Sequence, residues 1–410
     1  MTKKPNQNKL NQKNQKNILN SNKKYYFASA NTCFGFTHYF GEIFNPRRLE
    51  KIYLIKGCLG YEKSLKSHII NEIANKAAQQ KYSVECFCNP LSILNILSED
   101  CPQHYLDGIL INGLKTAVAD GTNPYINDSE YPGIVENIID LSEFFDEKKL
   151  MGSKKEIFEI TAKKKEFYDS AYKFLKAANE LVEYTMALIQ KYINDEKADA
   201  AIDRLFNKYL YEKYDIYDNN QDDVTAEEYR FINTVSPSGF NELETLETEA
   251  KKVFYITNDS FAGFYYTKKL LDKLGKIENE NIENANQRLR IISPDALNPS
   301  RIKAVYLKNP GILFVIKDKN EDKVYGDKYN FINMERFVSP DLKKDHKQKL
   351  KFIEKCYASI TDAAADCFKE IKALNSSVED IYLSSFKYAG SSEQDKYTEI
   401  IETIIKKIIM

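Results

Sequence analysis

A glycine, a lysine and a serine stand at the spacing of a phosphate-binding loop, and a second glycine, Gly60, lies inside the loop. The stretch Ile52–Ile70 (IYLIKGCLGYEKSLKSHII) runs from an apolar segment through a glycine-containing loop into a segment typical of a helix. Gly57 begins the pattern G-x-x-x-x-G-K-[ST], and Lys63 and Ser64 end it. In such a loop the backbone N–H groups and the lysine bind the phosphates, and the hydroxyl binds Mg²⁺. The predicted ATP-binding residues are Gly57, Gly60, Lys63 and Ser64.

The loop departs from the pattern at the residue before the lysine. A glycine there lets the backbone approach the phosphate closely, and this chain has Glu62 instead. The Cβ and the negative charge of Glu62 both oppose a nucleotide. The alternative interpretation is an ordinary strand–turn–helix in which Lys63 and Ser64 are incidental.

One carboxylate stands where it could complete such a site. Asp120 closes the apolar segment Thr116–Asp120 (TAVAD), and phosphate-loop folds place a carboxylate that supports Mg²⁺ at the end of such a strand. The predicted metal ligands are therefore Ser64 and Asp120. Aspartate also ends strands simply as a turn-former. Gly121 follows rather than a glutamate, so no base to position an attacking water is evident.

Length and charge limit the possible classes of protein. A chain of 410 residues exceeds a single hydrophobic core, so two or more domains are expected. The net charge of −1 gives no argument for binding nucleic acid or an acidic membrane. The chain has neither a long apolar run nor the apolar core of a signal peptide, so we expect a cytoplasmic protein that does not enter a membrane.

The cysteines allow two interpretations. Seven cysteines, an odd number, fit reduced thiols. Cys86 and Cys88 stand with Cys101 and His104 as a conceivable zinc cluster. Cys86 and Cys88 are also two apart in an apolar strand pattern, so both would point to one face and pack there.

Apolar patterning predicts strands alternating with helices, followed by a helical region. Near-continuous apolar strands favour a mainly parallel sheet in an α/β fold. Helical spacing over 154–192, followed by a second stretch to residue 213, predicts a helical hairpin over 154–213. Residues 1–24 are rich in Lys, Asn and Gln and predict a disordered tail. The acidic stretch 214–228 predicts a linker.

The second half repeats the first. Phe231–Phe240 matches Phe27–Phe36 at an offset of 204 residues, and Val253–Leu271 lies over Ile52–Ile70. The second loop has Phe264 in place of Lys63, so we expect no nucleotide there. The helical region repeats at an offset of 196, where Lys173, Lys176, Ala177 and Asn179 recur as Lys369, Lys372, Ala373 and Asn375. The predicted domains are 25–213 and a more degenerate copy, 229–410, with C-terminal helices.

Four stretches carry a resemblance to a known family: FASANTCFGF, IYLIKGCLGYEKS, LDGILINGLKTAVADGTNP and PGIVENIIDLSEFFDEKKL. The chain resembles bacterial tandem P-loop ATPase-like proteins, known largely as uncharacterised ATPases of spore-forming Gram-positive bacteria. The resemblance covers residues 25–410. The family's typical first loop, approximately GGPGTGKSS, falls on Gly57, Gly60, Lys63 and Ser64. Downstream, VADGTNP at 118–124 and the group Pro132, Gly133 and Glu136 match two further motifs.

The resemblance implies two tandem P-loop NTPase-like domains, each with a mainly parallel sheet and a helical hairpin. At Cys58, Leu59, Tyr61 and Glu62 the chain departs from the family's loop, which weakens the implied ATPase activity. We therefore expect an ATP-binding protein with weak or absent hydrolysis, holding ATP and Mg²⁺ in the first domain only.

The alternative function is a pseudo-ATPase scaffold that binds a protein partner through its helical hairpins. A kinase would need an arginine-rich lid, and the first half offers only Arg47, Arg48 and Arg204. A role in binding nucleic acid rests only on the lysine-rich tail.

Overall fold

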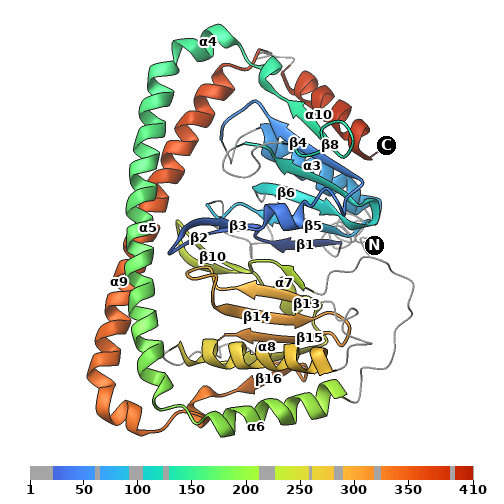
Figure 1. The fold of residues 1–410 in the computed structure, drawn as a ribbon. Coiled ribbons are helices and arrows are strands. Elements are labelled where there is room, and N and C mark those ends of the chain that lie inside the picture. Colours follow the sequence, from blue (N-terminus) through green and yellow to red (C-terminus); the bar gives the residue numbers. More distant parts are fainter. Residues whose placement is uncertain are drawn as a thin grey trace, which may run out of the picture.

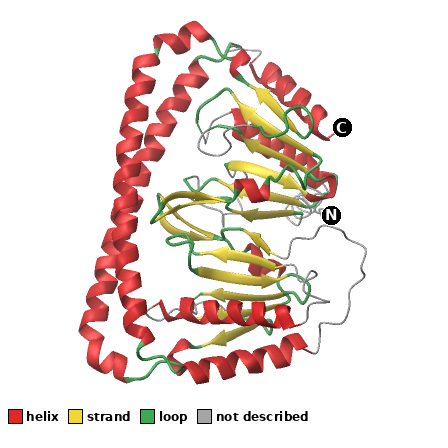
Figure 2. Ribbon diagram, in the orientation of Figure 1, coloured by secondary structure: helices red, strands yellow, loops and turns green. Residues whose placement is uncertain are grey.

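The computed structural model describes residues 22–60, 65–91, 105–122, 129–211, 227–257, 261–280, 290–317, 325–387 and 393–409. Within these ranges the protein is an α/β structure with two six-stranded mixed sheets, flanked by two long helices (Figures 1 and 2). Residues 1–21 of the expected tail and 214–226 of the expected linker lie outside the described residues. The tail prediction is wrong at its end, because Lys23 and Lys24 already belong to a strand.

The first sheet mixes parallel and antiparallel pairs. Across the sheet lie β1 (Lys23–Tyr26), β5 (Val84–Cys88), β6 (Leu106–Ile111), β7 (Thr116–Asp120), β4 (Lys51–Lys56) and β8 (Glu136–Asp140). Three of the five pairings are parallel, and β6 runs antiparallel to both of its neighbours. A short 3₁₀ turn, η1 (Asn112–Leu114), joins β6 to β7. It is too short for the crossover that parallel strands need, so this pair cannot be parallel.

The second sheet has the same topology. Its order is β16 (Tyr329–Ile332), β12 (Lys252–Ile256), β15 (Ile312–Ile316), β14 (Ile302–Leu307), β13 (Arg290–Pro294) and β9 (Glu227–Tyr229). Here too only β14 is antiparallel to its neighbours. The strands that the sequence comparison aligned, β4 and β12, therefore hold corresponding places in the two sheets, and so do their parallel neighbours β7 and β15.

Two hairpins lie between the sheets and mark an approximate twofold axis. They are β2–β3 (Ser29–Thr32, Gly35–His38) and β10–β11 (Asn233–Ser236, Gly239–Glu242). Phe27 N donates to Phe231 O at 2.9 Å, and Phe231 N donates to Phe27 O at 3.0 Å. These two residues are equivalent in the repeat, so the axis that relates the halves passes between them.

The alternation of side chains along each strand divides the core into layers. In β4, Tyr53 and Ile55 face the helix-covered side, whereas Ile52 and Leu54 join a cluster shared with the second sheet. Leu313 of β15 belongs to the same shared cluster. The short helices α2 (Phe40–Ile43) and α7 (Thr245–Glu249) contribute to this central layer.

The helices cross between the halves (Figure 1). After the short α4 (Glu147–Gly152), α5 (Lys154–Gln190) runs along α9 (Asp341–Ser384). Helix α6 (Asp195–Phe206) and the π-helical turn η3 (Asn207–Tyr211) pack with α8 (Ala262–Glu280) against the second sheet. Helix α10 (Glu393–Ile409) packs on α3 (Leu65–Gln79) against the first sheet. Each sheet is therefore covered partly by a helix encoded with the other half.

The predicted hairpin over 154–213 is wrong, because α5 pairs with α9 rather than with α6. Helical periodicity identifies an apolar face but not the element that covers it. Equivalent hydrogen bonds at the two ends of the helix pair show that both long helices cross between the halves in the same way. Ser339 N donates to Tyr192 O at 2.8 Å, and Asp146 N donates to Ser385 O at 2.7 Å. The corresponding residues in these two contacts are 193 positions apart in sequence.

The helical repeat also has a different register from the one predicted. At an offset of 193, the buried Leu175 corresponds to Phe368 and Ala178 to Ile371. The predicted offset of 196 aligned identical residues at mostly exposed positions, such as Lys173 with Lys369. Burial rather than identity sets the register, because only the apolar face is constrained by packing.

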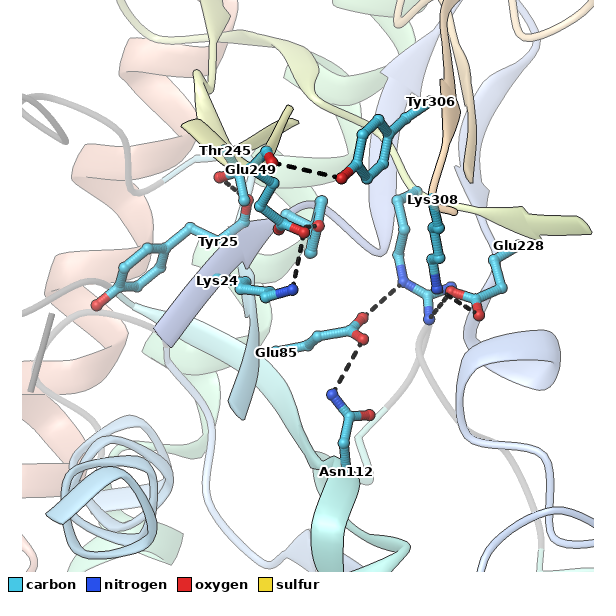
Figure 3. A network of polar contacts seen from close by, with 11 residues as sticks. Lys24, Tyr25, Glu85, Asn112, Glu228, Thr245, Glu249, Tyr306 and Lys308 are labelled. Carbon is cyan, nitrogen blue, oxygen red and sulfur yellow. Dashed lines mark hydrogen bonds and ion pairs between the residues drawn. The ribbon is translucent and has the colours of Figure 1, made fainter. Parts of the chain in front are cut away.

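A buried ion pair joins the halves beside the shared core (Figure 3). Arg230, which follows β9, donates through Nε to Glu85 Oε2 on β5 at 3.0 Å. Asn112 Nδ2 lies 3.4 Å from the other oxygen of Glu85. Nearby, Lys24 of β1 pairs with Glu249 of α7 at 2.7 Å. Within the described ranges, no helix is long and apolar enough to span a membrane.

Candidate functional site

The predicted loop follows β4 at the edge where several strands end. Asp120 lies beside Ile55 in the parallel pair β4–β7, and Gly121 N donates to Ile55 O at 2.9 Å. The structure thus brings Gly57 and Asp120 to one edge of the sheet, where α/β proteins place their ligands. Tyr61, Glu62, Lys63 and Ser64 lie outside the described residues.

Gly57 is required by its backbone conformation and by its neighbours. Its φ is +94°, a value that residues with a side chain rarely adopt. A Cβ there would lie 2.3 Å from Asp140 Oδ1 and 2.4 Å from Ser142 N. Because Asp140 ends β8, the start of the loop packs closely against the end of this neighbouring strand.

Gly60 receives a side chain from the distant helix α9. Its φ is +108°, and a Cβ there would lie 2.2 Å from Glu379 Cγ. Glu379 is 1% exposed. Sequence reasoning missed this residue because the loop and Glu379 are far apart along the chain and because Glu379 stands in an ordinary helical pattern.

Both oxygens of the Asp120 carboxylate are bound by protein groups. Lys66 Nζ, at the second residue of α3, lies 2.6 Å from Asp120 Oδ2, and both side chains are buried. Thr122 donates to Asp120 Oδ1 from its backbone N at 2.8 Å and from its hydroxyl at 2.6 Å. The predicted metal ligand is therefore a buried ion-pair partner here. Lys66 stands in the stretch Leu65–Ser67, whose sequence alone gives no sign of this role.

Burial shifts the pKa of two titratable groups, Cys58 in the loop and Lys164 near Glu379. It raises the pKa of the Cys58 thiol to about 11, an effect that Lys66 opposes, so this thiol stays protonated at neutral pH. Burial also lowers the pKa of Lys164 on α5, whereas the charge of Glu379 acts in the opposite direction. Both long helices therefore place charged side chains beside the loop.

The corresponding edge of the second half is filled by protein side chains. Phe264 stands where the alignment places Lys63, and the guanidinium of Arg301 lies 5.0 Å from the centre of its ring. Arg301 pairs with Asp295 at 3.0 Å and with Glu183 of α5 at 3.1 Å. A buried cation that already has two carboxylate partners offers little to a phosphate.

The zinc alternative finds no support among the described residues. Cys86 and Cys88 are buried in β5, and burial raises the pKa of Cys86 to about 12. Cys101 and His104 lie outside the described residues. Elsewhere in the described part of the chain, no three His, Cys, Asp or Glu side chains gather as metal ligands would.

The described loop edge therefore presents a buried ion pair, a buried thiol and a carboxylate delivered by α9. The charges of Lys66, Asp120 and Glu379 all act on the Cys58 thiol, and the Glu379 side chain lies against Gly60. The chain matches no protein-family model, no curated protein and no solved structure, so the geometry of its own side chains carries the functional inference.

Proposed function

We propose that this protein is a pseudo-ATPase scaffold. In this proposal the first half keeps a P-loop-like strand–loop–helix that no longer binds nucleotide, and the paired long helices bind a protein partner. The observation that carries the proposal is the packing of Glu379 from α9 against Gly60.

A carboxylate against the loop opposes a phosphate at the same place. Two like charges 4 Å apart repel by about 4 kcal/mol at the effective dielectric of a protein site. Glu62, inside the loop, adds a second negative charge in sequence. Phosphate binding would require Glu379 to leave, and with it the contact between α9 and the loop.

The residues also fit a magnesium ion poorly. Mg²⁺ needs oxygen ligands in near-octahedral geometry. The oxygens of Asp120 already bind Lys66 and Thr122 at hydrogen-bonding distances. A metal would have to displace the buried ammonium of Lys66 before it could use this carboxylate.

The long helices supply the surface for a partner. Phe158 on α5 and Phe352 on α9 are 63% and 66% exposed. Aromatic side chains, phenylalanine included, are enriched in the cores of protein–protein interfaces, so each ring is a candidate anchor for a partner. The two rings lie in the N-terminal parts of helices related by the approximate twofold axis, so they lie toward opposite ends of the helix pair (Figure 1).

A second candidate is an ATP-binding protein with weak or absent hydrolysis. The left-handed conformations of Gly57 and Gly60 and the parallel pairing of β4 with the strand that ends in Asp120 favour it. In that case the loop, with Lys63 and Ser64, would hold the phosphates ahead of α3, and Ser64 with Asp120 would reach the metal.

Calorimetric titration with Mg·ATP separates the two candidates. The scaffold proposal expects no binding up to millimolar ATP by the wild type or by Lys63→Ala. Micromolar binding that is lost in Lys63→Ala would overturn it in favour of the second candidate. Glu379→Gln, which keeps the shape and removes the charge, tests the blocking role. Binding that appears only in this variant would confirm that Glu379 closes the loop.

The partner surface is tested by photo-crosslinking in the cells that make this protein. A crosslinkable residue at Phe158 or Phe352 is expected to give one specific adduct of higher mass. The matched control is Lys155, whose side chain is 91% exposed on the same helix but polar. Equal crosslinking at all three positions, or none at the two phenylalanines, would overturn this part of the proposal.

A further inference from the structure

A small apolar pocket lies where α5 ends beside the start of α9. Figure 1 shows these two helix ends close together at the lower left. It has a volume of about 220 Å³. Its floor consists of Ile189, Met334 and Leu342, which are all buried. Its rim includes the exposed ion pair between Glu335 and Lys343. The pocket is thus apolar inside and polar only at its mouth.

The approximate twofold symmetry shows what the corresponding place holds in the first half. At the offset of 193 fixed by the helix-end hydrogen bonds, Ile189 corresponds to Tyr382 and Val338 to Phe145. The rings of Tyr382 and Phe145 pack edge to face with centroids 5.3 Å apart. Phe386, the counterpart of Ile193, packs on Phe145 at 5.9 Å. Three rings in the first half therefore correspond by symmetry to three aliphatic side chains in the second junction. Two of these aliphatic side chains, Ile189 and Val338, line the pocket.

We propose that this pocket binds a neutral molecule with a single aromatic ring. The two junctions share their backbone contacts, so the smaller side chains of the second half leave the space that rings occupy in the first. An enclosed apolar cavity of about 150 Å³ can bind benzene, so a pocket of about 220 Å³ with an open mouth has room for one ring. Met334 supplies a thioether, which packs favourably against ring edges. A charged ligand is excluded, because burying an unpaired charge on this floor would be too costly.

This site is separate from the loop, and neither Phe158 nor Phe352 lines it, so the proposed ligand does not depend on the proposed scaffold function. A ligand there would contact the end of α5 through Ile189 and the start of α9 through Leu342. It would therefore stiffen the junction at which the two helices exchange halves.

The test follows the methyl signal of Met334 in protein labelled with ¹³C-methyl methionine while phenol or toluene is added. We expect a saturable shift of the Met334 signal with a millimolar dissociation constant. Met151, which is 59% exposed on α4, serves as the reference and should not shift. The absence of a saturable Met334 shift up to the solubility limit of both probes would overturn the proposal.

Variants built from the first half sharpen the test. Ile189→Tyr with Val338→Phe copies the rings of the first half and should weaken binding at least tenfold while cooperative unfolding is kept. If the double variant does not fold, Val338→Phe alone, at a half-buried position, should give the same loss. The reverse change, Tyr382→Ile with Phe145→Val, should add a second binding site. Unchanged affinity in a folded, filled variant would place the ligand elsewhere.

Discussion

Replacing Arg230 with methionine should destabilise the whole chain, because this side chain joins the two halves at a buried position. Arg230 and its partner Glu85 have side chains only 5% and 11% exposed. Arg230 also donates through Nη1 to Tyr229 O at 2.9 Å. Methionine keeps the apolar stem and removes these donors. Among the described residues, the Glu85 carboxylate would then keep one weak donor, Asn112 Nδ2 at 3.4 Å.

The expected loss in the free energy of unfolding is about 3–5 kcal/mol, the usual cost of breaking a buried ion pair from one side. The loss depends on pH. Burial alone raises the pKa of Glu85, but Arg230 outweighs it and holds this pKa below its ordinary value. A depressed carboxylate pKa contributes stability that is present above the unfolded pKa and lost as the pH falls through the folded pKa. In Arg230→Met, protonation of Glu85 removes the cost of a buried unpaired charge. The difference in the free energy of unfolding between the variant and the wild type should therefore be smaller at about pH 4 than at about pH 7.

Urea unfolding followed by circular dichroism at both pH values measures this gap. The control is Lys155→Ala, which removes an exposed pair with Glu159 and should change the free energy of unfolding by less than about 0.5 kcal/mol. The double variant Glu85→Gln/Arg230→Met should recover part of the loss, because it leaves no buried unpaired charge. A loss below about 1 kcal/mol at pH 7, or a gap that widens in acid, would refute the reasoning.

Three further predictions concern single buried groups. Lys66→Met should lower the free energy of unfolding by about 3 kcal/mol in urea titrations, because it leaves Asp120 buried without its cation; a near-neutral effect would contradict the pairing. Iodoacetamide at pH 8 should modify Cys356 well before Cys58, whose thiol is buried and has a pKa of about 11; peptide mass spectrometry showing equal labelling would count against this. Asn375→Leu should increase the free energy of unfolding by about 1 kcal/mol and so raise the melting midpoint in calorimetry, because neither polar atom of Asn375 has a hydrogen-bond partner in the described chain. A melting midpoint below that of the wild type would contradict this prediction.

The apolar pattern was a good guide to the strands of the first sheet that are buried on both faces. The apolar segment at the start of Ile52–Ile70 lies in β4, and the segment Thr116–Asp120 coincides with β7. Strand β1 begins two residues inside the predicted tail, at Lys23 and Lys24. It lies at the edge of its sheet, where lysines are common because they prevent pairing with other chains. Composition alone could not distinguish this edge strand from a tail.

The candidate site was predicted only in the part that is local in sequence. The pattern placed Gly57 in a turn and Asp120 at a strand end, and the structure brings them to one edge. Lys66 and Glu379 could not be predicted, because each acquires its role from a residue far away along the chain. Lys63 and Ser64 lie outside the described residues, so their roles stay predictions.

The exchange of helices between the halves has a consequence for the order of events during synthesis. The first sheet lacks the cover of α10 until residues 393–409 have been made, nearly two hundred residues after the end of α6. At about 5–20 residues per second this interval lasts roughly 10–40 s. During that time the core under the first sheet lacks the buried side chains that α10 contributes, such as Ile401 and Ile405. A nascent chain that stalls in this interval would expose an apolar surface to chaperones.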